Sequence, residues 1–381
     1  MILSLFFTRG VSLKIWHEQG LLDREKLIYE EYLKQKKCEK IYWFTYGAGD
    51  MILSQQLKQE HKLHPMIEVF EMPNLFAIPK IGGYLYSLFL PFLYKKQLKE
   101  SSIFKTNQMD GSWSAVMCKY LYKTPLLLRT GYTLSIFSKK QKASKFKQFF
   151  SKKIESFAYN HADISTVASK QDQQYIIKEY NVPTEKLFVV TNYIDTSLFR
   201  QIPSEKHKTK IVFVGRLSNQ KNLFNLIEAL SNTDYELDIY GKGDLRLELE
   251  NFAKLKNANV SFKGVINNND LPIVLNQYNY YILASFYEGM PKTLLEAMAC
   301  GCVCIGTNVE GISEVITHDH TGYLSQSTDS KSLKEVIDLA ILSKTSKEII
   351  ENGINNIKDN YSLHSRVVLE SKMIEKVINE F

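Results

Sequence analysis

Short apolar runs alternate with helical patterns along the first half of the chain. Seven of these runs have the length and composition of buried strands, and amphipathic segments with a period near 3.6 residues separate them. Strands that alternate with helices indicate βαβ units and a parallel sheet. The predicted strands are 2–6, 41–45, 66–70, 102–106, 126–129, 164–167 and 187–190.

A second alternation of the same kind begins after a polar stretch, which predicts a linker over residues 196–209. At 381 residues the chain is too long for one ordinary core and fits two domains of about 190 residues each. We therefore predict an α/β fold with domains over 1–195 and 210–360. In the second domain, strands are predicted at 210–214, 236–240, 260–262, 281–285 and around 302–305, and helices at 291–299, 311–316 and 362–378.

The most informative stretch is 281–306, YILASFYEGMPKTLLEAMACGCVCIG. It predicts a strand, a loop, a helix that begins with Pro291 at its first position and ends at Gly301, and a further strand. The first amides of such a helix lack intrahelical partners, and the helix dipole adds to their positive field. The amides of 292–294 therefore predict a phosphate site at the carboxyl end of the preceding strand.

Two carboxylates flank this predicted phosphate site. Glu288 lies in the loop, and Glu296 follows eight residues later, in the second turn of the helix. A buried carboxylate beside a phosphate would repel it, so these groups are better suited to accept hydrogen bonds from sugar hydroxyls. A phosphate together with hydroxyls indicates a nucleotide sugar.

The spacing Glu288-x7-Glu296 followed by AMACG resembles the Glu-x7-Glu signature of retaining glycosyltransferases with the GT-B fold, family 4, also called glycosyl transferases group 1. The resemblance implies two Rossmann-like domains that face each other across a cleft, with 361–381 forming a helix that returns to the first domain. It covers 210–324 well, and the first domain only by topology and a few loops. It implies a nucleoside-diphosphate sugar as donor, either a UDP-sugar or a GDP-sugar.

The function implied by this resemblance is transfer of a hexosyl or N-acetylhexosaminyl group to a hydroxyl of a glycan or lipid-linked glycan, in cell-surface polysaccharide synthesis. Two alternatives stay open. One is a nucleotide-sugar epimerase of the same fold, and the other is a non-catalytic subunit that binds a sugar nucleotide in a glycan assembly complex.

Residues 215–222, GRLSNQKN, resemble the GR…K turn of these enzymes. Arg216 and Lys221 at a strand-to-helix turn can neutralise a diphosphate leaving group, although an exposed pair of helix-end cations would look the same. The chain holds no Asp-x-Asp pair, so we expect neither a metal nor another cofactor. The predicted catalytic residues are Arg216, Lys221 and Glu288. The predicted donor-binding residues are Gly10, Gly215, Val265, Gly289, Met290, Pro291, Lys292, Thr293, Leu294 and Glu296.

The first domain offers fewer candidates. Relatives carry a glycine-rich loop after the first strand, where this sequence keeps only Gly10. Two later strand ends, 106–108 and 129–132, would line the same edge of the sheet, where ligands of open α/β folds bind. Family members place a histidine near these positions, and this sequence has none there. Asn107, Gln108 and Arg129 are the acceptor-side candidates.

The net charge of +7 is unevenly distributed. Residues 1–200 hold 29 Lys and Arg against 18 Asp and Glu, and the rest of the chain is slightly acidic. Residues 139–153, KKQKASKFKQFFSKK, combine seven lysines with three phenylalanines and no acid, which suits either an anionic membrane surface or a solvated helix. No nucleic-acid motif accompanies the charge, so we expect no nucleic acid as partner.

A second apolar stretch, 81–94, is too short to span a bilayer and predicts an amphipathic helix packed on the sheet, with a loop that dips into a membrane as the alternative. The five cysteines fit a reducing cytosol, and we expect Cys302 and Cys304 to be buried on a strand. The predicted location is therefore cytoplasmic, with peripheral binding to the inner face of the cell membrane as a further hypothesis.

Overall fold

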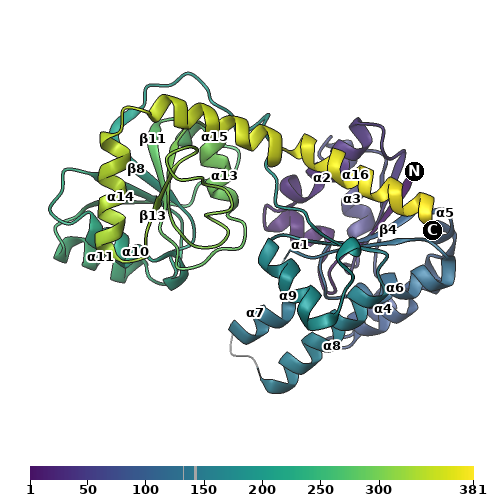
Figure 1. Ribbon diagram of the computed structural model, residues 1–381. Coiled ribbons are helices and arrows are strands. Elements are labelled where there is room, and N and C mark those ends of the chain that lie inside the picture. The colour runs from purple at the N-terminus through teal and green to yellow at the C-terminus, as the bar shows by residue number, and fades with distance from the viewer. Residues whose placement is uncertain (132, 141–143) are drawn as a thin grey trace. The chain divides into compact units, whose positions relative to one another are not determined.

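The computed structural model describes residues 1–131, 133–140 and 144–381, and these divide into two compact units (Figure 1). The first unit comprises 1–191 and 367–381, and the second comprises 192–366. Each unit is a Rossmann-like α/β fold built on one parallel sheet.

The sheet of the first unit has seven strands in the order β3-β2-β1-β4-β5-β6-β7, and every neighbouring pair is parallel. All seven predicted strands are present, each within one residue of its expected ends. Their bounds are β1 Ile2–Phe6, β2 Lys40–Phe44, β3 Ile67–Phe70, β4 Ile103–Thr106, β5 Leu126–Arg129, β6 Ile164–Val167 and β7 Leu187–Val189. Both faces of this sheet are covered, which explains why its strands are continuous apolar runs.

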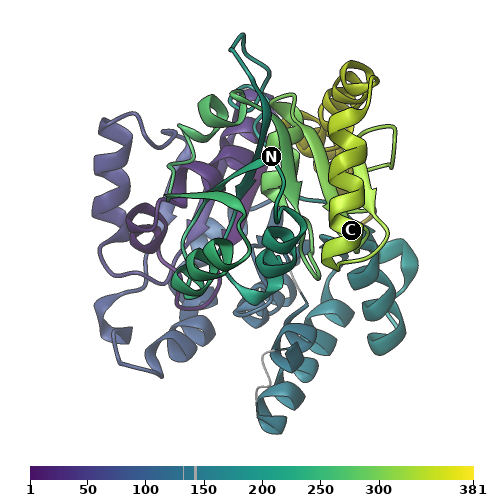
Figure 2. The ribbon, with the colours of Figure 1, turned by 90° about the vertical axis from the view of Figure 1, so that its left-hand side faces the viewer.

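Helices cover both faces of this sheet. On one face α1 contacts α2 and α3, and on the other α6 contacts both α4 and α8. The pair α7 and α8 projects from the remainder of the unit (Figure 2). The helices are α1 Leu13–Glu18, α2 Leu22–Lys34, α3 Asp50–Gln59, η1 Asn74–Phe76, α4 Gly82–Leu93, α5 Lys95–Glu100, α6 Ser112–Tyr122, α7 Leu134–Lys140, α8 Lys145–His161, α9 Lys170–Tyr180, η2 Thr184–Lys186 and α16 Leu363–Glu380.

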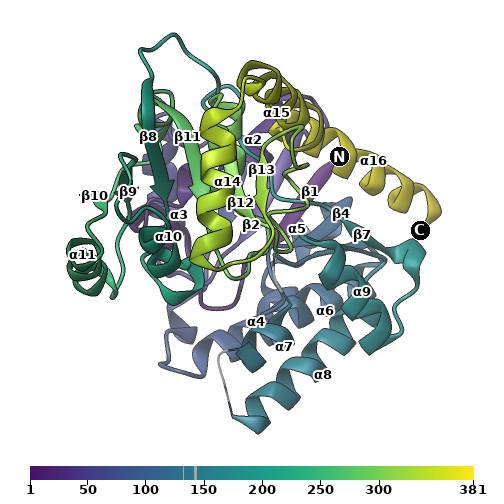
Figure 3. The same cartoon turned by 60° about the vertical axis from the view of Figure 1, so that its left-hand side comes forward.

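The second unit has a six-stranded parallel sheet in the order β10-β9-β8-β11-β12-β13. Its strands are β8 His207–Val214, β9 Glu236–Tyr240, β10 Asn259–Gly264, β11 Tyr278–Leu283, β12 Val303–Thr307 and β13 Tyr323–Ser325. Helix α14 crosses one face of this sheet beside α10, whereas α13 contacts α15 (Figure 3). The helices are η3 Asn219–Lys221, α10 Leu223–Ala229, α11 Arg246–Leu255, α12 Leu271–Leu275, α13 Lys292–Ala299, α14 Ser330–Leu342 and α15 Ser346–Asn360. In the described parts of both units, no helix is long and apolar enough to cross a membrane.

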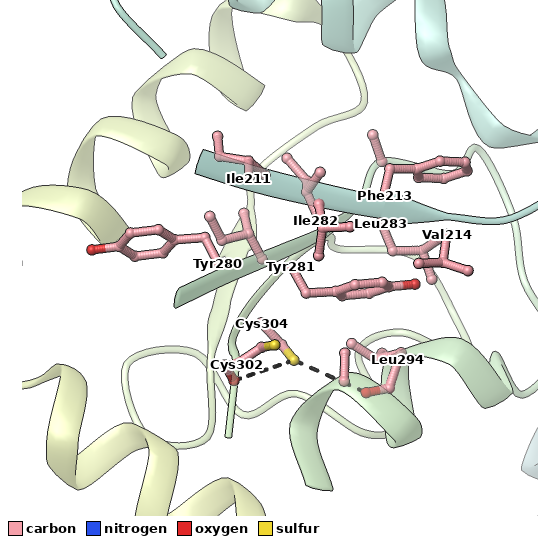
Figure 4. Close-up of a cluster of buried hydrophobic side chains, with 14 of the residues drawn as sticks. Ile211, Phe213, Val214, Tyr280, Tyr281, Ile282, Leu283, Leu294, Cys302 and Cys304 are labelled. Atoms are coloured by element: carbon pink, nitrogen blue, oxygen red, sulfur yellow. Dashed lines mark hydrogen bonds between the residues drawn. The ribbon is translucent and has the colours of Figure 1, made fainter. Parts of the chain in front are cut away.

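The core of the second unit is centred on β11, whose side chains pack against β8, β12 and α13 (Figure 4). Cys302 and Cys304 lie in this core, and the Cys304 thiol approaches the carbonyl of Leu294. Burial raises the pKa of the Cys302 thiol to about 12, so the thiol stays protonated and is a poor metal ligand at neutral pH. The prediction that these cysteines are buried is confirmed.

Several local predictions were wrong. Strand β8 begins at His207, whereas the sequence predicts a linker as far as residue 209. Strand β11 spans Tyr278–Leu283 rather than 281–285. Residues 311–316 form hydrogen-bonded turns instead of a helix. There Gly311 has a φ of +79°, and a Cβ at this position would lie 2.0 Å from the Gly289 carbonyl oxygen. Only glycine permits this close approach of the Gly289 loop to the backbone of Gly311.

Candidate active site

The candidate site lies where the strand order of the second unit reverses. Strand β8 continues to β9 on one side, while β11 pairs with β8 on the other, so the loops after β8 and β11 meet at one edge of the sheet. Open α/β sheets bind ligands at such a switch point, outside the carboxyl ends of the strands. The β8 loop carries Arg216 and Lys221, and the β11 loop carries Glu288.

The Glu288 carboxylate is the centre of a hydrogen-bonded cluster. The Lys221 ammonium lies 2.5 Å from Glu288 Oε1, and the Ser285 hydroxyl donates to the same oxygen over 2.6 Å. The Gln220 amide reaches Oε2 at 3.5 Å and donates to the Tyr287 carbonyl at 2.9 Å. Both charged side chains are mostly buried, with 15% of Lys221 and 8% of Glu288 exposed. The cluster therefore holds one positive and one negative charge at the edge of the sheet.

The loop that carries Glu288 is anchored from two further elements. Thr307, the last residue of β12, donates its hydroxyl to the Ser285 carbonyl at 2.6 Å. Asn192 donates its side-chain amide to the Met290 carbonyl at 3.1 Å. Because strands on either side of β11 and the chain before β8 all hold this loop, the Glu288 side chain is fixed in position.

The start of α13 offers backbone donors beside this cluster. Pro291 is the N-cap rather than the first helical residue, and it makes no side-chain cap hydrogen bond. The Leu294 amide bonds to the Pro291 carbonyl at 3.2 Å, which removes it from the predicted set of free donors. The Thr293 amide makes no such backbone bond within the described chain. The Thr293 amide and the positive end of the helix dipole form an anion-binding position.

Side chains of α13 lie on both sides of this helix start. Tyr281 donates its hydroxyl to Thr293 Oγ1 at 2.8 Å, and the Lys292 ammonium lies 5.4 Å from the centre of the Tyr193 ring. Glu296 is buried in the second turn, with 6% of its surface exposed. Burial raises the pKa of Tyr281, and the nearby carboxylates of Glu288 and Glu296 add to this effect, so its hydroxyl remains a donor.

Three loops of the sheet edge pack backbone against backbone. A Cβ on Gly241, whose φ is +151°, would lie 1.8 Å from the Gly215 carbonyl oxygen. The Gly241 amide also donates to the Gly264 carbonyl at 2.7 Å. Only glycine permits this approach. The contact aligns the loops after β8, β9 and β10, including Val265, which is 66% exposed.

Arg216 lies apart from the carboxylate cluster. Its side chain is exposed, and within the described chain its guanidinium has no hydrogen-bond or ion-pair partner. Gly289 is also exposed, and a Cβ there would meet no described atom within 4 Å. The structure thus brings Lys221 and Glu288 together and leaves Arg216 facing solvent on the neighbouring loop.

The first unit gathers its three candidates at the carboxyl ends of β4 and β5. Arg129 donates to the side-chain oxygen of Asn107 at 3.1 Å, and the Gly131 amide donates to the Gln108 side chain at 3.0 Å. Tyr132, which the sequence placed in the same loop, lies outside the described residues. Arg129 is oriented by Asn107, which is itself buried.

The β1 loop of the first unit differs from an open phosphate site. Gly10 has a φ of +77° in the exposed turn, but the amides at the start of α1 already have partners. Buried Asp50 accepts from the Leu13 and Lys14 amides at 2.8 and 3.1 Å, and Ser12 caps the helix. The Asp50 carboxylate therefore occupies the anion-binding end of α1.

Comparison with known proteins agrees with this architecture. Residues 195–356 match the family described as glycosyl transferases group 1. The chain is a glycosyltransferase with the GT-B fold. The glycosyltransferase is 29% identical over 293 residues to UDP-Gal:alpha-D-GlcNAc-diphosphoundecaprenol alpha-1,3-galactosyltransferase of Escherichia coli, covering 70% of this chain and 75% of that protein.

A second relative of this glycosyltransferase comes from Campylobacter jejuni. It is the GalNAc-alpha-(1->4)-GalNAc-alpha-(1->3)-diNAcBac-PP-undecaprenol alpha-1,4-N-acetyl-D-galactosaminyltransferase, 25% identical over 278 residues, or 70% of this chain and 74% of that protein. Among solved structures, Anabaena Alr3699/HepE in complex with UDP superimposes with a TM-score of 0.73 at 19% identity, and covers 100% of both chains. The sucrose-phosphate synthase of Thermosynechococcus elongatus gives the same TM-score at 18% identity and equal coverage. These structural likenesses establish the fold.

Sequence reasoning missed the residues that hold Glu288 in place. Ser285 and Gln220 were read only as parts of a strand and of a turn, although both donate hydrogen bonds within the Glu288 loop. The sequence shows only that Ser285 ends a buried apolar run and that Gln220 directly precedes Lys221. Neither position predicts a contact until the adjacency of β8 and β11 is known.

Proposed function

We propose that this glycosyltransferase is a retaining enzyme of family 4 that transfers a sugar from a UDP-sugar or GDP-sugar to a hydroxyl of a lipid-linked glycan during cell-surface polysaccharide synthesis. The names of the Escherichia coli and Campylobacter jejuni relatives, which act on undecaprenol-linked sugars, support the acceptor class. The free, buried cysteines suit a cytoplasmic location.

The observation that carries the proposal is the Lys221–Glu288 pair beside the start of α13. A cation, the Thr293 amide and a helix dipole at one sheet edge favour a diphosphate. A carboxylate within the same cluster favours a group rich in hydroxyls. A nucleoside-diphosphate sugar carries both kinds of group, because its diphosphate is bonded directly to the anomeric carbon of a sugar that bears the hydroxyls.

Lys221 would exchange partners when the donor binds. The diphosphate would replace Glu288 as the acceptor of the Lys221 ammonium, and Glu288 would then accept hydrogen bonds from the donor sugar. Arg216 has no hydrogen-bond or ion-pair partner among the described residues to give up, so its guanidinium would bind the same phosphates. As the glycosidic bond breaks, negative charge grows on the departing diphosphate, and both cations and the α13 amides would stabilise it. Two fixed cations can do this without a divalent metal, so we propose metal-independent transfer.

The nucleoside would occupy the edge of the second unit formed by the aligned glycine loops. Glu296 would accept from the ribose hydroxyls, and backbone groups near Val265 would meet the base. The acceptor hydroxyl would bind at the Asn107, Gln108 and Arg129 group of the first unit. Retention of configuration, with attack from the face that the leaving group vacates, rests on the family resemblance and is tested by the anomeric configuration of the product.

The first experiment is thermal stabilisation of the purified protein by UDP, GDP, ADP and their sugars without added metal. A ligand of the folded state raises stability by RT ln(1 + [L]/Kd), so the donor should exceed the other nucleotides at equal concentration. In Glu296→Ala, the donor should raise the unfolding temperature no more than the other nucleotides do. A flat response at saturating concentration would contradict a nucleotide-sugar site.

The second experiment measures transfer to an undecaprenyl-diphosphate-linked sugar. Lys221→Ala should lower kcat by about 10² to 10³, the cost of a lost charge-stabilising donor. Lys256→Ala is the matched control, because Lys256 forms an exposed ion pair with Glu228 in the same unit. Unchanged turnover in Lys221→Ala would refute the assigned role. Donor conversion without acceptor would identify the epimerase, and nucleotide binding without any turnover would identify the non-catalytic subunit.

A further inference from the structure

Helix α4 carries an uncovered apolar face on the first unit. Its buried side, which includes Tyr86, Ser87 and Leu90, packs into the unit, whereas its outer side is also apolar. The outer residues recur at helical spacing and are all at least one-third exposed: Tyr84, Leu85, Leu88, Phe89, Phe92 and Leu93. We call these six residues the α4 face. The predicted helix is confirmed, but it is not amphipathic, because its outer side is apolar as well.

The α4 face is unusual for a surface exposed to water. The helix GGYLYSLFLPFL contains no charged residue, and Phe92 is 60% exposed. Exposed apolar residues are common one at a time, but a contiguous patch on one helix marks an interaction surface. Phe89 and Phe92 lie one turn apart, so a partner would contact both at once.

A basic helix lies in the same layer. Helix α6 contacts both α4 and α8. On α8 the exposed rings of Phe146, Phe149 and Phe150 form a second apolar stripe, and Lys145 and Lys147 beside them are exposed. Of the basic segment predicted from the sequence, 141–143 lie outside the described residues. The described part places its aromatic and basic side chains together on the outer surface of α8.

Charge identifies the partner as anionic. Between residues 72 and 154 the sequence has fifteen Lys or Arg and two acidic residues, Glu100 and Asp110. Asp110 forms a bidentate pair with Arg9, and Glu100 accepts a hydrogen bond from Tyr42, so both carboxylates already have partners in the fold. This segment therefore supplies many lysines and few carboxylates; Lys152 on α8 pairs with Glu179 on α9, which lies outside the segment.

We propose that the α4 face and the outer surface of α8 together bind an anionic lipid bilayer. Rings and leucines that enter the region between headgroups and acyl chains, with lysines at the phosphate level, are the combination that holds a protein in that plane. A protein partner could cover the apolar stripes, but a bilayer matches both the extended area and the one-sided charge. The proposal concerns attachment and stands independently of the transfer reaction.

The orientation of α4 connects this surface to the sheet edge of the same unit. At the start of the helix the Arg9 guanidinium lies 3.9 Å from the centre of the Tyr84 ring, and Trp113 stacks on that ring with an angle of 8° between the planes. Arg9 belongs to the loop that follows β1. A bilayer on the α4 face would thus lie next to the carboxyl edge where Asn107 and Arg129 are held.

The test is sedimentation of the full chain with vesicles of phosphatidylcholine and phosphatidylglycerol, compared with phosphatidylcholine alone. We expect binding to the anionic vesicles that weakens as salt rises. Phe89→Ser with Phe92→Ser should abolish binding, and each lysine neutralised, as in Lys145→Gln or Lys147→Gln, should lower the partition coefficient about fivefold. Matched controls are Leu255→Ser and Leu342→Ser on the second unit, both over three-quarters exposed, and Lys34→Gln on α2.

The outcomes separate the occupants of this surface. Loss of vesicle binding in the α4 and α8 variants but not in the controls would support the bilayer. Equal binding to neutral vesicles, or binding that survives both sets of variants, would overturn it. If the protein does not bind vesicles but forms dimers, and Phe89→Ser with Phe92→Ser makes it monomeric, the α4 face binds a second copy of the chain. This result also overturns the proposal. Circular dichroism of each variant checks that it remains folded.

Discussion

The last helix of the chain is joined to the first unit by an ion pair that water does not reach. Lys105 on β4 pairs with Glu370 on α16, and neither side chain has any exposed surface. The Glu370 carboxylate also accepts from the Tyr32 hydroxyl at 2.6 Å. Residues 265 positions apart in the sequence thus share one buried charge pair. Removal of either charge should destabilise this unit strongly.

The magnitude follows from the burial. A buried charge whose partner is removed keeps its desolvation cost and loses its compensation, which typically costs about 3 to 5 kcal/mol. Glu370→Gln keeps an acceptor for Tyr32 and removes only the charge, and Lys105→Met replaces the ammonium with an apolar end. The double variant removes both members of the pair, so its loss should be far smaller than the sum of the two single losses.

The assay uses the three tryptophans, Trp16, Trp43 and Trp113, which all belong to the first unit. Tryptophan fluorescence in urea therefore reports the unfolding of this unit. With an m-value near 3 kcal/mol per molar, a loss of 3 to 5 kcal/mol lowers the urea midpoint by about 1 to 1.7 M.

The exposed pair of Lys40 and Glu68 in the same unit serves as the control, with nitrogen and oxygen 3.0 Å apart. Glu68→Gln should cost at most about 1 kcal/mol, because water screens this pair. If Glu370→Gln lowers the midpoint no more than Glu68→Gln does, or if the double variant loses the full sum of the single losses, the reasoning about burial is wrong.

Two further predictions concern backbone packing and pH. Gly241→Ala should destabilise the second unit by more than about 2 kcal/mol, because the added Cβ would collide with the carbonyl oxygen of Gly215. The control is Gly264→Ala, where φ is +81° but the added Cβ would meet open space, and it should cost about 1 kcal/mol. Thermal unfolding measures both losses. Burial raises the pKa of Glu155 above 4.5, so the folded state binds this proton more tightly than the unfolded chain. Its contribution to stability is therefore present at low pH and declines as pH rises from 4.5 through the folded pKa. The urea midpoint of the wild type should therefore fall with rising pH across this range relative to the midpoint of Glu155→Gln. If the two midpoints change with pH in parallel, the assignment to Glu155 is wrong.

Much of the fold could be predicted from the sequence because it depends on local rules. Buried parallel strands are continuous apolar runs, so seven strands of the first unit were placed within one residue. Gly301 was recognised as a helix stop because its left-handed backbone, φ +75°, is a property of one position. The Glu288 loop and α13 were found in the same way, from a strand, a proline and a helix that follow one another directly.

Tertiary structure decided what those elements bring together. The contact between Lys221 and Glu288 requires β8 and β11 to be neighbours, although β9 and β10 lie between them in the sequence. The periodicity of α4 could not show which side faces water, because both sides are apolar and only the neighbouring helices determine what is covered. The same holds for Lys105 and Glu370. A charge at a single position has no partner until the chain folds, and strand order and helix packing are collective properties of the whole sequence.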